Sequence, residues 1–212
     1  MFQVLFPKTI ETQKSKFNGT ITIQKFLGKY SINTDNLTQT GGLVTTIWKK
    51  AFRHLDKRVF PTPPKQILIL GLGGGGVIDF MTKKWQASQI TGIEIDPIMI
   101  DLGKKYFKLD DCQNLNIVRA DAIRWLQKNH NNFDLILIDL YIGRTSPEIS
   151  QTENFFKSIK DHLNPQGAAV FNRLVLSNQK KEAKKFKSAL NRVFPHTTRI
   201  PTPVNWLLLC QS

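Results

Sequence analysis

Three carboxylic acids stand at the ends of predicted strands, where they could hold a ligand or move a proton. Glu94 lies in the strand predicted at residues 90–95, Asp121 follows an apolar run, and Asp139 ends another. A carboxylate can accept hydrogen bonds from ribose hydroxyls or an adenine amino group, and it can also take up a proton. Because ligands of open α/β sheets bind at the carboxyl ends of the strands, we expect the three acids to share a site. For Asp121, capping of the following helix is the alternative interpretation.

A glycine-rich turn precedes the first of these acids. The segment ILILGLGGGGVIDF, residues 67–80, places a buried strand against a run of glycines and then begins a helix. Gly71, Gly73 and Gly76 fit G-x-G-x-x-G, a pattern that lets the backbone turn tightly and approach a ligand closely. Together with Glu94, the turn predicts an adenosine-type ligand. Nicotinamide dinucleotides and adenosyl-methionine both satisfy this prediction.

The elements that must position these residues alternate between strand and helix. Asp96 before Pro97, and Asp121, are favoured helix N-caps. Because continuous apolar strands alternate with helices, the chain predicts a parallel sheet covered on both faces, a Rossmann-like α/β domain. The strands are predicted at residues 66–70, 90–95, 114–120, 133–140, 168–172 and 206–210, with a turn at residues 164–167.

A proline-rich segment at residues 60–65 divides the chain. Three prolines in four positions cannot occupy a helix or a central strand, so they predict a stiff connector. Before it, residues 19–35 alternate apolar and polar side chains as in a hairpin, and residues 42–55 show helical spacing. We therefore predict an N-terminal β-hairpin and helix element at residues 1–60 and a Rossmann-like nucleoside-binding domain at residues 61–212.

Composition sets further limits on partners. The formal net charge of +14 would suit a polyanion, but in residues 179–194 Ala183, Phe186, Leu190 and Val193 recur at helical spacing, which leaves the lysines on a solvated face. Nucleic acid stays an alternative partner that no motif supports.

Scattered histidines and two distant cysteines predict no metal site. No apolar run approaches about 18 residues, so we expect a soluble, cytoplasmic protein and no membrane partner.

Taken together, the motifs resemble the spermidine synthase-like family of class I adenosyl-methionine-dependent transferases. The resemblance covers nearly the whole chain, in ETQKSKFNGTITIQ, DNLTQT, ILILGLGGGGV, GIEIDP, RADAIRWL, FDLILID and IPTPVNWLLLC. It implies a seven-stranded, mostly parallel sheet whose last strand is antiparallel, beside a small N-terminal β-hairpin element. It also implies S-adenosyl-methionine or decarboxylated S-adenosyl-methionine as cofactor, and a homodimer.

The resemblance also implies roles for particular residues. Glu94 would hold the ribose, Asp121 the adenine, and Asp139 would be the catalytic base. The implied cofactor-binding set is Gly71, Gly73, Gly75, Glu94, Asp121, Ala122 and Gln39. We therefore expect an enzyme that transfers an aminopropyl or methyl group to an unidentified small-molecule acceptor.

The chain departs from the pattern of this family at several positions. Gly74 stands where the glycine loop usually carries an acid, Ile142 where a second acid usually follows the catalytic strand, and Trp48 where a tyrosine is usual. These differences keep open a catalytically silent nucleoside-binding or interaction protein of the same fold. A nicotinamide-dependent oxidoreductase also stays open, because the glycine fingerprint permits it.

Overall fold

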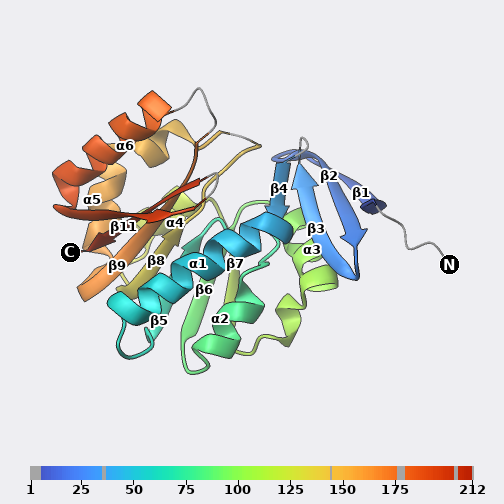
Figure 1. Cartoon of the computed structure of the whole chain (residues 1–212), viewed down its shortest axis with the longest axis horizontal. Coiled ribbons are helices and arrows are strands. Elements are labelled where there is room, and N and C mark those ends of the chain that lie inside the picture. The colour runs from blue at the N-terminus through green and yellow to red at the C-terminus, as the bar shows by residue number, and fades with distance from the viewer. Residues whose placement is uncertain (1–5, 35–36, 144, 176–179, 203–204, 212) are drawn as a thin grey trace.

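Two sheets organise the chain in the computed structural model, which describes residues 6–34, 37–143, 145–175, 180–202 and 205–211 (Figure 1). Residues 35–36 of the predicted N-terminal hairpins and residues 203–204 of the predicted closing pair lie outside the described residues. The first sheet is an antiparallel meander of β1 (Lys8–Ser15), β2 (Gly19–Phe26), β3 (Lys29–Thr34) and β4 (Leu37–Thr40).

The second sheet has seven strands in the order β10-β11-β9-β8-β5-β6-β7. Among these strands β11 alone runs in the opposite direction, since it pairs antiparallel with both β10 and β9 and the other pairs are parallel. This confirms the predicted mostly parallel sheet with a reversed last strand. The strands are β5 (Gln66–Leu70), β6 (Gln89–Glu94), β7 (Leu115–Arg119), β8 (Phe133–Ile138), β9 (Leu163–Leu174), β10 (His196–Pro201) and β11 (Asn205–Gln211).

Helices cover both faces of this larger sheet (Figure 1). The predicted N-caps are confirmed, because the Asp96 carboxylate accepts from the N–H of Ile98 and the Asp121 carboxylate accepts from the N–H groups of Ile123 and Arg124. The helices are α1 (Gly42–Arg58), α2 (Ile78–Lys84), α3 (Pro97–Phe107), α4 (Ala122–Lys128), α5 (Glu153–Asp161) and α6 (Lys180–Val193), with short 3-10 turns η1 (Leu109–Asp111) and η2 (Glu148–Gln151).

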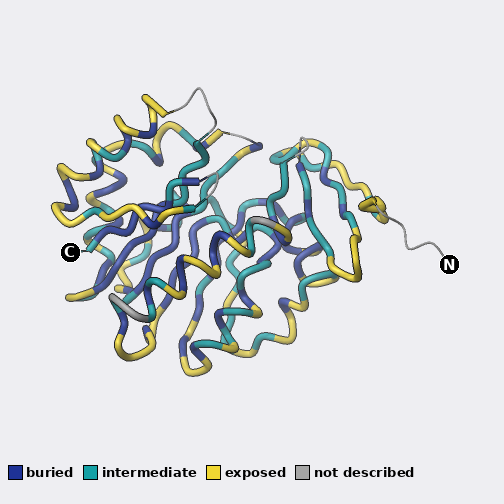
Figure 2. The backbone as a smooth tube through the Cα atoms, in the orientation of Figure 1, coloured by how far each residue is buried: buried dark blue, intermediate teal, exposed yellow. Residues whose placement is uncertain are grey.

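Alternation along β5 shows how the core is divided between the two faces. Ile67 and Ile69 pack into the layer that contains α1 and α2, whereas Leu68 and Leu70 pack into the layer that contains α4, α5 and α6. Strands β5, β6, β8 and β11 are accordingly buried along most of their length (Figure 2), whereas the edge strands β7 and β10 are more exposed. Because both faces are covered, the strands read as continuous apolar runs rather than as alternating ones.

The helix α1 joins the N-terminal segment to the larger sheet. Its residues Trp48, Phe52 and Leu55 are buried in the same core layer as Ile69. The small sheet packs separately, on α3, through buried residues Ile21, Ile23, Ile32, Met99 and Leu102. The domain boundary at residue 60 stays a prediction.

One predicted boundary is wrong. The strand expected at residues 168–172 begins at Leu163, because Leu163 pairs with Phe133 before the register shifts to the pair Ala168 and Leu135. The predicted turn at residues 164–167 is therefore a bulge inside β9.

In α6 the predicted apolar face is confirmed: Ala183, Phe186, Leu190 and Val193 are buried. Within the described ranges, each helix is too short or too polar to cross a bilayer.

Removal of the ring of Phe156 should destabilise the fold strongly. This residue is fully buried and packs edge-on against Phe171 and Phe186. We expect Phe156→Ala to lower the free energy of unfolding by about 3–5 kcal/mol, because it leaves a cavity in the core. Urea denaturation followed by circular dichroism measures the change. Phe26→Ala, at a 40% exposed position of β2, is the matched control and should cost less than about 1 kcal/mol. Equal losses would contradict the core assignment.

Candidate active site

Gly71 brings two neighbouring strand ends together. Its N–H donates to the carbonyl oxygen of Ile93 at 3.0 Å, and its φ angle is +87°. A Cβ at this position would lie 2.3 Å from the backbone oxygen of Asp139. The left-handed backbone and this contact both require glycine. The ends of β6 and β8, which carry Glu94 and Asp139, therefore lie beside the glycine turn.

Glu94 is a buried carboxylate that binds two backbone donors. One oxygen accepts from the N–H of Gly73 at 2.7 Å, and the other accepts from the N–H of Asp96 at 2.9 Å. Burial raises the pKa of Glu94 above its ordinary value, and the two hydrogen bonds oppose that rise. Because a carboxylate oxygen can accept more than one hydrogen bond, Glu94 could also accept from ligand hydroxyls.

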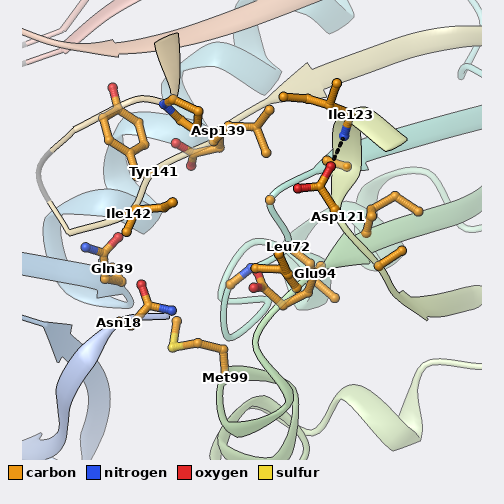
Figure 3. A pocket seen from close by; sticks show the side chains of 18 residues that line it. Asn18, Gln39, Leu72, Glu94, Met99, Asp121, Ile123, Asp139, Tyr141 and Ile142 are labelled. Atoms are coloured by element: carbon orange, nitrogen blue, oxygen red, sulfur yellow. Dashed lines mark hydrogen bonds between the residues drawn. The ribbon is translucent and has the colours of Figure 1, made fainter. Parts of the chain in front are cut away.

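The two interpretations of Asp121 are compatible. One carboxylate oxygen caps α4 by accepting from Ile123 at 3.0 Å and from Arg124 at 2.9 Å. In Figure 3 its other oxygen is directed toward the cavity. The same side chain can thus begin a helix and contact a ligand.

Asp139 is held by side-chain donors from two other elements. Its Oδ2 accepts from Nε1 of Trp48 on α1 at 3.1 Å, and its Oδ1 accepts from Nδ2 of Asn172 on β9 at 2.7 Å. Burial raises the pKa of Asp139 to about 6, although both hydrogen bonds act in the opposite direction. A carboxylate with this pKa is mostly ionised at neutral pH and is a stronger base than an exposed aspartate.

A cavity of about 120 Å³ gathers most of the predicted site residues. Asp139 and Gln39 lie on one side of it, and Glu94 and Asp121 lie on the other (Figure 3). Gly75 does not line it; its N–H donates to the carbonyl oxygen of Leu72. The predicted residues that do line the cavity are Gln39, Gly71, Gly73, Glu94, Asp121, Ala122 and Asp139. We call this space the nucleoside cavity; the ligand roles of these residues and of Gly75 stay predictions.

A second cavity of about 230 Å³ lies on the other side of Asp139. Gln39, Asp139 and Tyr141 line both cavities, so they form the boundary between them. The remaining described lining residues of the second cavity are Leu37, Thr38, Val44, Ile47, Asn172, Leu174 and Asn205. We call it the acceptor cavity. Asp139 is therefore accessible from two spaces that could hold two reactants.

Comparison with known proteins identifies the family of this chain. The family model described as the spermine/spermidine synthase domain matches residues 46–210. The chain belongs to the spermine/spermidine synthase family. A probable polyamine aminopropyl transferase of Bifidobacterium longum is 36% identical over 112 residues, which is 52% of this chain and 24% of that protein.

Two further proteins are similar to this chain. An eEF1A lysine and N-terminal methyltransferase homolog of Drosophila melanogaster is 28% identical over 159 residues, 70% of this chain and 23% of that protein. This chain therefore spans about a quarter of the length of either curated relative. A crystal structure of spermidine synthase in complex with the transition state analogue AdoDATO has a TM-score of 0.75 at 22% identity, over 96% of this chain and 73% of that one. It shows a shared fold.

The two positions at which the chain lacks the usual acids have different surroundings. Gly74 faces the N-terminal sheet: its N–H donates to Oγ1 of Thr40 at 3.0 Å, and a Cβ would lie 2.3 Å from Cδ1 of Ile32. Ile142 lines the nucleoside cavity and is 55% exposed. Of the two substitutions, only the one at Ile142 therefore changes the lining of the cavity.

Several residues of this site escaped sequence reasoning. Asn18 lines the nucleoside cavity, and its Nδ2 donates to the Asp96 carboxylate at 2.7 Å. Tyr141 lies between the cavities, and its hydroxyl donates to the carbonyl oxygen of Asn172 at 3.1 Å. Asn172 ends the predicted strand at residues 168–172, and a polar residue at the carboxyl end of a parallel strand was the available signal. No local signal marks Asn18, because its position depends on how the two sheets pack.

Loss of the Trp48 donor should raise the pKa of Asp139. We expect Trp48→Phe to move this pKa above about 6, since the hydrogen bond favours the charged carboxylate. A ¹³C NMR titration of the aspartate carboxyl carbons measures it. Trp85→Phe is the matched control: Trp85 lies in the same core layer, and its Nε1 has no partner among the described residues. An unchanged pKa in Trp48→Phe would contradict the contribution of this hydrogen bond.

Proposed function

We propose that this protein transfers an aminopropyl group from decarboxylated S-adenosyl-methionine to an amine. The observation that carries the proposal is the charge of the nucleoside cavity. Its described lining includes the acids Glu94, Asp121 and Asp139 and no lysine, arginine or histidine. The decarboxylated donor is doubly cationic, with a sulfonium and an ammonium group, whereas S-adenosyl-methionine also carries a carboxylate. A buried charge needs an opposite partner, so an acidic lining favours the donor without the carboxylate.

The position of Asp139 supports the chemistry of this transfer. The acceptor nitrogen would attack the methylene carbon next to the sulfonium, forming a C–N bond as the C–S bond breaks and its electron pair stays on sulfur. The proton that the nitrogen loses would pass to Asp139, which lines both cavities. The remaining residues would mainly orient the two bound reactants, which makes the reaction between them effectively intramolecular. Methylthioadenosine and the aminopropylated amine would be the products.

Methyl transfer is the second candidate. The similarity to the eEF1A lysine and N-terminal methyltransferase homolog favours it, and its donor would be S-adenosyl-methionine.

A catalytically silent protein is disfavoured by Asp139, because a carboxylate with a pKa of about 6 between two cavities is an arrangement found at functional sites. A nicotinamide-dependent oxidoreductase is disfavoured by the matching family model.

Calorimetry should separate the donors. We expect decarboxylated S-adenosyl-methionine to bind at least tenfold more tightly than S-adenosyl-methionine, because the acidic lining repels the additional carboxylate. Glu94→Ala should weaken binding of methylthioadenosine roughly tenfold or more, the effect of about 1.5–3 kcal/mol for a hydrogen bond to a charged group. Tighter binding of S-adenosyl-methionine would favour methyl transfer, and binding of NAD alone would contradict both transferase proposals.

The pH dependence of turnover should reveal Asp139 as the base. With decarboxylated donor and an amine, we expect kcat/KM to lose an additional factor of ten per pH unit below about pH 6, because protonated Asp139 cannot accept the proton. Asp139→Asn should lower kcat at least about 100-fold and lack this additional acid limb, while methylthioadenosine affinity stays similar.

A matched control for this experiment lies on the same strand. Asp134 is at the opposite end of β8, where its carboxylate accepts from the backbone N–H groups of Lys65 and Gln66. Asp134→Asn should keep the acid limb and turn over normally once folded. Unchanged turnover in Asp139→Asn would remove this residue from the role of base.

A further inference from the structure

The carboxylate of Asp139 determines how the amide beside it must point. An ionised carboxylate accepts hydrogen bonds and donates none, so the side chain of Asn172 turns its NH₂ group toward it. Nδ2 of Asn172 donates to Oδ1 of Asp139 at 2.7 Å. The amide oxygen of Asn172 is therefore directed away from Asp139. It needs a donor of its own, because Asn172 is partly buried.

Asn205 supplies this donor from the neighbouring strand. Its Nδ2 donates to Oδ1 of Asn172 at 2.6 Å, and Asn205 is itself buried. The contact follows from the antiparallel register, in which Leu207 pairs with Asn172 and Asn205 precedes Leu207 by two residues. Side chains at such diagonal positions lie on one face and can reach each other. Two hydrogen bonds therefore lead from Asn205 through Asn172 to Asp139.

The backbone of Asn172 is fixed separately. The hydroxyl of Tyr141 donates to the carbonyl oxygen of Asn172 at 3.1 Å and accepts from the N–H of Leu174. Tyr141 follows Asp139 by two residues, so its hydroxyl joins the segment after β8 to the end of β9. With its main chain held, Asn172 can still rotate its amide group about the last side-chain bond. The direction of that amide is what Asn205 can control.

Protonation of Asp139 would change the contact that it prefers. A carboxylic acid has an O–H donor, so an unrestrained Asn172 amide would rotate by half a turn and present its oxygen. That contact would favour the neutral acid over the carboxylate. The rotation would also bring Nδ2 of Asn172 against Nδ2 of Asn205, which places donor against donor and removes a hydrogen bond. Asn205 therefore opposes the rotation.

We infer that Asn205 is a positioning residue for Asp139. It holds the amide oxygen of Asn172, and so it keeps a donor against the carboxyl group before and after a proton is taken up. The hydrogen bond from Asn172 opposes the effect of burial on the pKa of Asp139, and Asn205 maintains it. The kinetic consequence of this inference rests on the proposed function, since Asp139 is the base of the proposed transfer.

The pKa of Asp139 tests the inference without any substrate. A ¹³C NMR titration of the aspartate carboxyl carbons measures it, and Asp139→Asn assigns the signal. Asn205→Leu keeps a similar size without the donor and should raise the pKa by at least about half a pH unit. In the Asn172→Leu background, the same substitution should change the pKa by less than about 0.2 pH units, because Asn205 acts through Asn172. An equal rise in both backgrounds, or no rise in the first, would overturn the inference.

A matched control lies at the opposite end of β8. Nδ2 of Asn164 donates to the carboxylate of Asp134 at 2.8 Å, so this pair repeats the contact between an amide and an aspartate. Asn164→Leu should leave the pKa of Asp139 unchanged, and a rise as large as that in Asn205→Leu would contradict the specific role of Asn205. If circular dichroism shows that Asn205→Leu does not fold, Asn205→Ala also lacks the donor and makes the same comparison.

The pH dependence of turnover gives a second measurement, with decarboxylated S-adenosyl-methionine and an amine as substrates. The kcat/KM of Asn205→Leu, divided by that of the unmodified protein, should be about threefold lower at pH 5 than at pH 8, because more of Asp139 is protonated in the variant. A quotient that is the same at both pH values would overturn the positioning role. No turnover by the unmodified protein across a wide amine panel would overturn the proposed function alone, because the pKa comparison does not depend on turnover.

Discussion

The buried carboxylate of Glu94 is the interaction on which the arrangement of the site depends. It accepts from the N–H groups of Gly73 and Asp96, and so it joins the glycine turn after β5 to the first turn of α3. The side chain of Asp96 accepts in turn from Ser15 and Asn18, at the turn between β1 and β2. A buried carboxylate without such donors would be strongly unfavourable. Glu94 and Asp96 together therefore connect the glycine turn, α3 and the N-terminal sheet beside the nucleoside cavity.

Asp139 has a different environment from Glu94, and this difference suggests a division of roles. Glu94 is fixed by backbone donors, which suits a group that holds a ligand. Asp139 has side-chain donors, Trp48 and Asn172, and a pKa raised to about 6, which suits a group that takes up a proton. On one side of Asp139 the cavity is acidic, and on the other it is mostly aliphatic. The acidic side suits the cationic nucleoside donor that we propose.

Much of the fold could be predicted because its signals are local. Apolar runs, helix caps and the glycine turn each depend on a few neighbouring residues, and the structure confirms them at β5, at Asp96 and at Asp121. The start of β9 could not be predicted in this way. Its first residue is defined by the pairing of Leu163 with Phe133, thirty residues earlier, and the proline and glycine of the bulge resemble an ordinary turn. The position of Gly74 against Ile32 likewise depends on contact between two sheets.

By itself, the sequence determined the alternation of strands and helices over residues 66–193 and the acids at the strand ends, because periodicity and residue type are properties of short segments. Parallel pairing then brings the ends of neighbouring strands to one edge, which is why Glu94 and Asp139 could be expected together. Only the tertiary structure decided which side chains surround them. Trp48 lies 91 residues from Asp139 in the chain and Asn172 lies 33 residues from it, yet both donate to its carboxylate. The aliphatic walls of the acceptor cavity come from the consecutive elements β4 and α1 and from the distant β9, and only the packing of β4 and α1 against the sheet brings them together.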